Sequence, residues 1–290
     1  MTIDSFTKAH WYAVGRPEDV AEGATRKTRL LGTDIEISRC GSELDARKIE
    51  NGNFKKIPLQ VRYGHLWTTM SDDPKPLFEM PEFDEDGRRL VTAGAISVRC
   101  SAPRAVENFL DMAHFPFVHT GILGDEAHSE VADYNVEMRS DVDEVWATKC
   151  EMYQPQAAAS AAGGQITRYM YRVPHPTVSI LYKTCPIRPE GVWDLVGLFI
   201  QPREEDLCDV HSFVLVFDED NTDVGLLHFQ QTIFIQDRMI LENQVPRTLP
   251  LDPRSELPTR ADASSIAFRR WLKAKGVKYG VNESQPSPVH

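Results

Sequence analysis

The 290-residue sequence lacks the cysteine spacings that usually hold metals. It contains no Cys-x-x-Cys and no Cys-x-His, the arrangements through which chains ligate zinc or iron–sulfur clusters. We therefore expect no cysteine-held metal or cluster within this chain. The cysteines are odd in number and far apart, which predicts buried reduced thiols; they are Cys40, Cys100, Cys150, Cys185 and Cys208.

Long apolar runs and basic clusters are also missing. No apolar segment approaches the ~18 residues of a membrane span, and residues 1–15 carry charges where a signal peptide needs an apolar core. The net charge is −11, and lysine and arginine never stand more than two in a row. Because nucleic-acid phosphates and anionic lipids are bound by clustered positive charge, we expect no nucleic-acid or membrane partner and a cytoplasmic location.

The first 89 residues predict a thin β module. Strand-like runs occur at Trp11–Val14, Arg29–Arg39 and Val61–Met70. The polar stretch Cys40–Lys56 between them is predicted as a loop, and the proline- and acid-rich Ser71–Arg89 as a connector. Three strands bury too little apolar surface for a clearly independent domain.

Residues 90–280 predict the main domain. Three helices are expected: one starting near Ser101, one over Asp223–Asn243 and one over Arg260–Lys275. The expected strands are Leu90–Cys100, Tyr134–Met138, Glu144–Met152, Gln165–Val173, Val178–Thr184, Trp193–Gln201 and Val210–Phe217. Strands in the middle with long flanking helices indicate an α+β fold in which an antiparallel sheet grips a helix. Residues 281–290 are predicted to be a disordered tail.

The strongest chemical signal surrounds Asp111. Asp111 and His114 are three residues apart, so a helix would place them on one face. We expect Pro116 to break that helix, which lets the chain turn His119 back toward the same point. A metal there needs a third ligand, and Asp237 is the best candidate, because an ionised carboxylate in apolar surroundings needs a partner. Two histidines and one carboxylate form the facial triad of non-haem Fe(II) oxygenases.

Helix geometry places a candidate substrate pocket beside that triad. Gln230 lies seven residues before Asp237, nearly on the same face two turns back. Gln230, Ile233 and Phe234 would then line one wall of an apolar pocket that carries a single amide. Asn108, on the other helix, is a further candidate substrate contact.

Spacing alone leaves alternatives open. The chain has nine histidines, and a buried histidine is often only a hydrogen-bonded core residue. Asp237 could equally be a surface carboxylate. A rival signature also exists, since His128 and Glu130 have the H-x-D/E spacing of 2-oxoglutarate oxygenases, with His175 or His211 as the distal ligand.

Segments spread over the chain match one enzyme family. They are Trp11–Val14, Arg29–Gly32, Tyr63–Trp67, Asn108–His119, Gln236-Asp237 with Glu242 and Gln244, and residues 260–272. In these segments the chain resembles a Rieske non-haem iron oxygenase over nearly its whole length. The resemblance implies a helix-grip (START-like) catalytic domain at 90–280, a Rieske-type β domain at 1–89, and iron held by His114, His119 and Asp237.

One departure from that family is large. The family binds a 2Fe–2S cluster in C-x-H and C-x-x-H loops, and Cys40–Lys56 stands where those loops belong. Residues 1–89 are therefore interpreted as a reduced, cluster-less remnant of the Rieske-type domain. This pattern is similar to a Rieske-less catalytic subunit of bacterial caffeine degradation that N-demethylates 7-methylxanthine.

That closer resemblance implies an Fe(II)- and O2-dependent monooxygenase that converts 7-methylxanthine to xanthine and formaldehyde. A Rieske-containing reductase, using NADH and flavin, would supply the cluster within a trimer-based hetero-oligomer that includes a glutathione-transferase-like bridging protein. Asp111 would link the partner's cluster to His114. Two alternatives stay open: an O-demethylase or hydroxylase of another aromatic compound, and a non-catalytic scaffold subunit. Retention of the predicted metal ligands argues against a scaffold.

Overall fold

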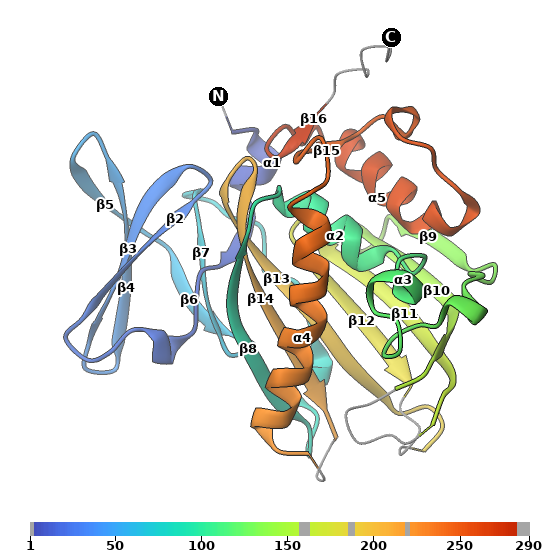
Figure 1. The fold of residues 1–290 in the computed structure, drawn as a ribbon. Coiled ribbons are helices and arrows are strands. Elements are labelled where there is room, and N and C mark those ends of the chain that lie inside the picture. Colours follow the sequence, from blue (N-terminus) through green and yellow to red (C-terminus); the bar gives the residue numbers. More distant parts are fainter. Residues whose placement is uncertain (1–2, 157–162, 185–188, 218–220, 283–290) are drawn as a thin grey trace.

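The computed structural model describes residues 3–156, 163–184, 189–217 and 221–282, and a seven-stranded antiparallel sheet forms its centre (Figure 1). The strand order is β8-β14-β13-β12-β11-β10-β9. The bounds are Arg89–Val98 (β8), Asn135–Arg139 (β9), Glu144–Gln154 (β10), Gln165–His175 (β11), Val178–Thr184 (β12), Trp193–Glu204 (β13) and Leu207–Val216 (β14). Each strand predicted for the main domain is therefore confirmed, with small shifts at the ends.

Three helices cover one face of this sheet. They are α2 (Ala102–Leu110), α4 (Asp223–Leu241) and α5 (Ala263–Ala274). Ser101 caps α2 by accepting a hydrogen bond from the backbone N–H of Arg104, as its sequence position predicts. Figure 1 shows α4 running across the sheet. Apolar side chains from the sheet and all three helices form one cluster, and the α+β prediction is confirmed.

The N-terminal chain covers the other face of the sheet. Strands β1 (Trp11–Ala13), β7 (His65–Thr69) and β6 (Leu59–Arg62) form a small antiparallel sheet in that order. Trp67 packs on Phe199 of β13, with ring centroids 4.8 Å apart. Residues on both sides of the predicted boundary at 89/90 thus share one apolar cluster. The division into two domains stays a prediction.

A second N-terminal sheet occupies the region predicted as a polar loop. Its strands are β2 (Thr25–Leu30), β3 (Thr33–Cys40), β4 (Glu43–Glu50) and β5 (Asn53–Ile57). The loop prediction for Cys40–Lys56 is therefore wrong. Asn51 and Gly52 both have positive φ, of 51° and 77°, and Asn-Gly is the preferred two-residue hairpin turn. The strands it joins were misjudged because adjacent charged residues, Arg47-Lys48 and Lys55-Lys56, interrupt the apolar alternation along them.

Turns hidden inside apolar runs caused two further errors. Arg29–Arg39 is two strands separated by Leu31-Gly32, and Val61–Met70 is a hairpin that turns at Tyr63-Gly64. Each turn residue has positive φ, between 50° and 74°, a conformation that glycine adopts freely. The interpretation of residues 1–89 as a Rieske remnant stays a prediction.

Short elements complete the chain. Strand β15 (Leu249–Pro250) pairs in parallel with β16 (Val281–Asn282), so the predicted disordered tail is wrong for residues 281–282; residues 283–290 lie outside the described residues. The remaining elements are α1 (Ser5–Lys8), α3 (Phe115–Val118) and the 3-10 turns η1 (Pro17–Asp19), η2 (Pro81–Asp84), η3 (Glu126–His128), η4 (Pro253–Ser255) and η5 (Arg260–Asp262).

The cysteine prediction is confirmed only in part. Cys100, Cys150 and Cys208 are free and buried, whereas Cys40 is free and exposed, because β3 ends there at the sheet's margin. Cys185 lies outside the described residues. In the described part of the chain, no helix combines the length and apolarity needed to cross a membrane.

Candidate metal centre

The chain turns sharply where α2 ends. The helix stops at Leu110, and Asp111 has an extended backbone with φ −84° and ψ 118°. The expectation that Asp111 and His114 share a helix face is therefore wrong. A turn brings them together instead: Asp111 Oδ1 accepts a hydrogen bond from the backbone N–H of Ala113 at 2.7 Å, and Oδ2 lies 3.2 Å from His114 Nδ1.

His114 and His119 flank the single turn of α3. Pro116 lies in the first turn of that helix, where the missing N–H of proline costs nothing. Pro116 therefore starts a helix here, and the expectation that it breaks one is wrong. The turn still brings the two imidazoles together, since their Nε2 atoms are 3.2 Å apart.

Asp237 completes the site from the buried face of α4. Its Oδ1 lies 3.2 Å from His114 Nε2 and 3.0 Å from His119 Nε2. Ligand bonds of about 2.1 Å at right angles place ligand atoms about 3.0 Å apart. Asp237 Oδ1 has no hydrogen-bond partner within the described structure although it is buried. The three atoms thus fit one face of an octahedral metal, and no other such group occurs among the described residues.

The outer nitrogen of each imidazole is held by a hydrogen bond. His119 Nδ1 donates to Oε1 of Gln236 at 2.8 Å, and Asp111 holds His114 Nδ1. Such contacts fix the tautomer and leave the Nε2 lone pairs free for a metal. Gln236 was not predicted; its only signal in the sequence is its place directly before Asp237.

The charges at this site suit a divalent cation. Burial lowers the pKa of His114, but the carboxylates of Asp111 and Asp237 outweigh burial and raise that pKa to about 9. Without a metal the imidazole therefore carries a proton on Nε2 at neutral pH, and a bound divalent cation would displace this proton. Burial raises the pKa of Asp237, but contact with His114 and His119 brings it below its usual value. Asp237 is therefore ionised, as a carboxylate ligand of iron needs to be.

A cavity opens next to the three ligand atoms. It encloses about 680 Å³, part of it open to solvent, and the two histidines and Asp237 lie along it. The predicted substrate contacts Asn108, Gln230, Ile233 and Phe234 all line this cavity. The 3.6-residue period of α4 therefore places Gln230, Ile233 and Phe234 on the face that lines the cavity, as predicted. That these residues bind substrate remains a proposal.

The opposite wall of the cavity was not predicted. It is formed by the sheet, and its side chains include Gln154, Tyr169, Tyr171, Lys183 and Ser212. The alternation of side chains along a strand predicts which residues share a face of the sheet. It does not predict which of the two faces lies under α4. The tyrosines were therefore indistinguishable from ordinary core residues.

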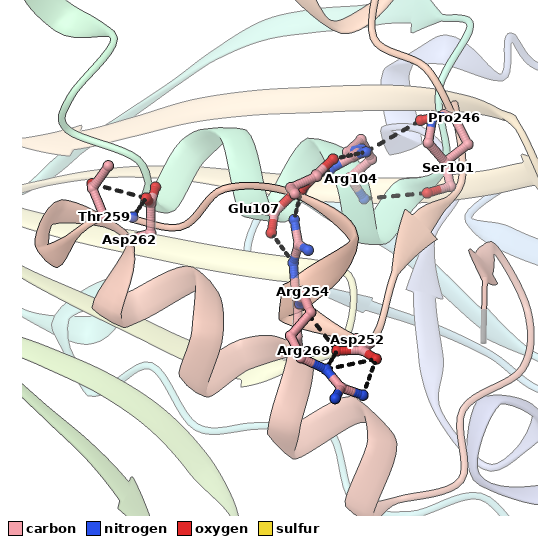
Figure 2. A network of polar contacts seen from close by, with 10 residues as sticks. Ser101, Arg104, Glu107, Pro246, Asp252, Arg254, Thr259, Asp262 and Arg269 are labelled. Carbon is pink, nitrogen blue, oxygen red and sulfur yellow. Dashed lines mark hydrogen bonds and ion pairs between the residues drawn. The ribbon is translucent and has the colours of Figure 1, made fainter. Parts of the chain in front are cut away.

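An ion-pair network, also not predicted, joins α2 to α5 (Figure 2). Glu107 accepts hydrogen bonds from Arg104 at 2.8 Å and from Arg269 of α5 at 2.5 Å. Glu256 contacts the same two guanidinium groups. Glu107 and Arg269 are 162 residues apart, so no local pattern indicates the pair. The network anchors the helix that leads into Asp111.

A second cleft gives Asp111 access to solvent. Arg104, Glu107, Asp111, His114 and Glu256 are among its lining residues. The Asp111 side chain is 28% exposed, against 1% for His119. Asp111 therefore reaches from the surface to the outer nitrogen of His114.

The rival metal signature is not formed. His128 and Glu130 are exposed, and His128 stacks on Tyr153. His175 is buried beside His10, and His211 beside His65. None of them converges with two further ligands among the described residues.

The sequence has clear relatives. Residues 98–277 match the family model described as the vanillate O-demethylase oxygenase C-terminal domain. The chain is 44% identical over 277 residues to the probable methylxanthine N7-demethylase NdmC of Pseudomonas sp. (strain TJI-51), covering 96% of this chain and 97% of that protein. It is 27% identical over 228 residues to the methylxanthine N1-demethylase NdmA of Pseudomonas putida, covering 75% and 60%.

Solved structures share the fold. NdmA of Pseudomonas putida with caffeine superimposes with a TM-score of 0.75 at 15% identity, covering 98% of both chains. NdmB of the same organism gives 0.74 at 18% identity, covering 93% of this chain and 91% of NdmB. Dicamba monooxygenase bound to dicamba gives 0.70 at 15% identity, covering 94% and 99%.

Proposed function

Because this chain belongs to the Rieske non-haem iron oxygenase family, among the methylxanthine N-demethylases, we propose that it removes the N7-methyl group of 7-methylxanthine as an Fe(II)- and O2-dependent monooxygenase. The observation that carries this proposal is the convergence of His114, His119 and Asp237, at 3.0–3.2 Å, on one end of a largely apolar cavity. The 44% identity to a probable methylxanthine N7-demethylase supports the substrate.

The reaction balances as a two-electron monooxygenation. Bound ferrous iron supplies the activation of O2, since a facial triad leaves coordination positions open. One oxygen atom enters a C–H bond of the N-methyl group, and the resulting hemiaminal loses formaldehyde to leave xanthine. The other oxygen atom becomes water with two protons and with two electrons that NADH supplies through the partner protein. We propose that this reaction takes place in the cytoplasm. Gln230 and the apolar residues Ile233 and Phe234 hold the ring with its methyl group toward the ligands, and Asn108 adds a polar contact.

Electrons are proposed to reach this site from another protein. The chain is proposed to hold no 2Fe–2S cluster, so a Rieske-containing reductase with flavin supplies it, joined through a glutathione-transferase-like bridging protein in a trimer-based hetero-oligomer. The cleft at Asp111 supports this route, because Asp111 joins solvent to His114 Nδ1 over one hydrogen bond.

A second candidate reaction is O-demethylation of an aromatic methyl ether. The matching family model is named after vanillate O-demethylase. Insertion of oxygen into a methyl C–H bond would release formaldehyde from an aryl methyl ether in the same way as from an N-methyl group. A non-catalytic scaffold is disfavoured, because a scaffold has no need of three converging ligand atoms.

Reconstitution tests the proposal. The iron-loaded chain, its Rieske-containing reductase and NADH are incubated with 7-methylxanthine, caffeine or vanillate, and formaldehyde and ring products are measured. We expect formaldehyde and xanthine in equal amounts from 7-methylxanthine, and none when the reductase lacks a Rieske domain. Turnover of vanillate alone would support the second candidate instead.

A further inference from the structure

Two tyrosine hydroxyls on the sheet wall of the cavity lack partners. Tyr169 and Tyr171 lie on β11 and point to the same face, since they are two residues apart. Both side chains are 1% exposed and both line the cavity. Neither hydroxyl has a hydrogen-bond partner among the described residues. The Ser212 hydroxyl, on β14 along the same wall, is also unpartnered there.

Two other tyrosines that are equally buried, Tyr12 and Tyr63, do have partners. The hydroxyl of Tyr12 donates to the backbone carbonyl of Thr7 at 2.7 Å, and that of Tyr63 donates to the carbonyl of Phe78 at 2.8 Å. A buried hydroxyl without a partner is unfavourable. Because Tyr169 and Tyr171 also line the cavity, their unpartnered hydroxyls are candidates for hydrogen bonds to a bound ligand.

Packing explains the tyrosine rings but not their hydroxyls. The Tyr171 ring meets Phe109 edge-on with centroids 6.0 Å apart, and the Tyr169 ring meets Phe115 at 6.4 Å. Phenylalanine would make the same ring contacts. Burial raises the pKa of both hydroxyls well above the usual value, so they keep their protons and are able to donate hydrogen bonds.

We propose that the Tyr171 hydroxyl, with Tyr169 beside it, donates a hydrogen bond to a carbonyl oxygen of the bound ring and makes an oxo group a requirement for tight binding. This inference rests on the proposed function, and it names the feature of the substrate that the sheet wall recognises. Apolar residues such as Leu181, Val196 and Leu198 on the same wall suit the face of a planar, uncharged heterocycle.

Variants that lose only the hydroxyl test this role. Tyr171→Phe and Tyr169→Phe are compared with Tyr279→Phe, whose hydroxyl is also unpartnered among the described residues but lies outside the cavity. Dissociation constants of iron-loaded proteins are measured for 7-methylxanthine, for 7-methylhypoxanthine, which lacks the 2-oxo group, and for 7-methyl-2-hydroxypurine, which lacks the 6-oxo group. Iron content and melting temperature are measured in parallel.

Loss of the hydroxyl should weaken the oxo contact alone. We expect Tyr171→Phe to bind 7-methylxanthine about five- to tenfold more weakly, with unchanged iron and an equal or higher melting temperature. The analogue that lacks the contacted oxo group should bind wild type and Tyr171→Phe equally. Tyr279→Phe should bind all three compounds as the wild type does.

Several outcomes separate this inference from the proposed function. Unchanged affinity for 7-methylxanthine in both cavity variants overturns the tyrosine role while demethylation stands. A fall in melting temperature with equal weakening for all three compounds also overturns it, because that indicates a structural role. Tyrosine-dependent binding without demethylation supports the inference and removes the proposed function. Failure of the wild type to bind any of the three compounds overturns both.

Discussion

The two walls of the cavity differ in chemistry. The sheet wall offers the hydroxyls of Tyr169 and Tyr171 together with the side chains of Lys183 and Gln154, and it carries none of the three candidate metal ligands. The helix wall, α4, carries both Asp237 at the metal end and the amide of Gln230 two turns away. One helix therefore sets the distance between the candidate metal ligand Asp237 and the proposed substrate contact Gln230, whereas the sheet wall is proposed to contact the substrate alone. Substitutions on α4 are therefore expected to affect iron binding or substrate binding, whereas substitutions on the sheet wall are expected to affect substrate binding alone.

The largest effect is expected from removing an imidazole ligand. His119→Ala should lose iron and reduce turnover to background, because two ligands hold a metal far less well than three. His119 is buried and its ring lies 5.9 Å from that of Phe115 in the apolar core, so the fold should survive with a small fall in melting temperature. Iron content, formaldehyde release and melting temperature are the measurements. His228→Ala, an exposed histidine on α4, is the matched control and should behave as wild type.

Asp111→Asn should separate the electron path from the metal site. The amide keeps the size of the side chain and some hydrogen bonding to His114, but it removes the charge. We expect near-normal iron and melting temperature, with turnover lowered by orders of magnitude because electrons no longer reach His114. Wild-type turnover in this variant contradicts the linking role, and joint loss of iron and stability assigns Asp111 a structural role.

Gln236→Leu removes the hydrogen bond that orients His119. Partners of metal-bound histidines contribute about 10- to 100-fold to metal affinity, so the iron dissociation constant should rise by that range. Gln231→Leu is the control on the same helix, because the Gln231 amide donates to the carbonyl of Ala93 at 2.9 Å and does not touch a ligand. Equal iron affinity in the two variants contradicts this role for Gln236.

The smallest effect distinguishes the two walls directly. Gln230→Leu should raise KM for 7-methylxanthine about tenfold, with unchanged iron, because it removes one amide from the substrate contacts of α4. Tyr171→Phe should raise KM in the same way from the sheet side. Loss of iron in Gln230→Leu would contradict this, because it would mean that Gln230 supports the metal site as well as the substrate.

Local patterns predicted the helix wall of the cavity and the three side chains that converge beside it. Asp111, His114 and His119 stand close in sequence, and the helical period of α4 relates Gln230 to Asp237. The reason given for the approach of Asp111 and His114 was wrong, because a helix end is set by backbone geometry that apolar spacing does not reveal.

Features that depend on pairing between distant segments were missed. Adjacent charged residues interrupt the apolar alternation of strands β4 and β5, and the Asn51-Gly52 turn alone indicated a hairpin. The Glu107–Arg269 pair and the Tyr169–Tyr171 face depend on which elements meet in space. Contacts between such distant elements follow from the packing of the whole fold, and a short window of sequence does not predict them.

Iron analysis of the purified chain and of Asp237→Ala tests the central claim most directly. If His114, His119 and Asp237 hold a mononuclear iron, the wild type should bind about one Fe(II) per chain, without the visible absorption of a Rieske cluster. Asp237→Ala should then remain folded and bind far less iron. A Rieske spectrum in the wild type, or full iron in Asp237→Ala, would contradict the assignment.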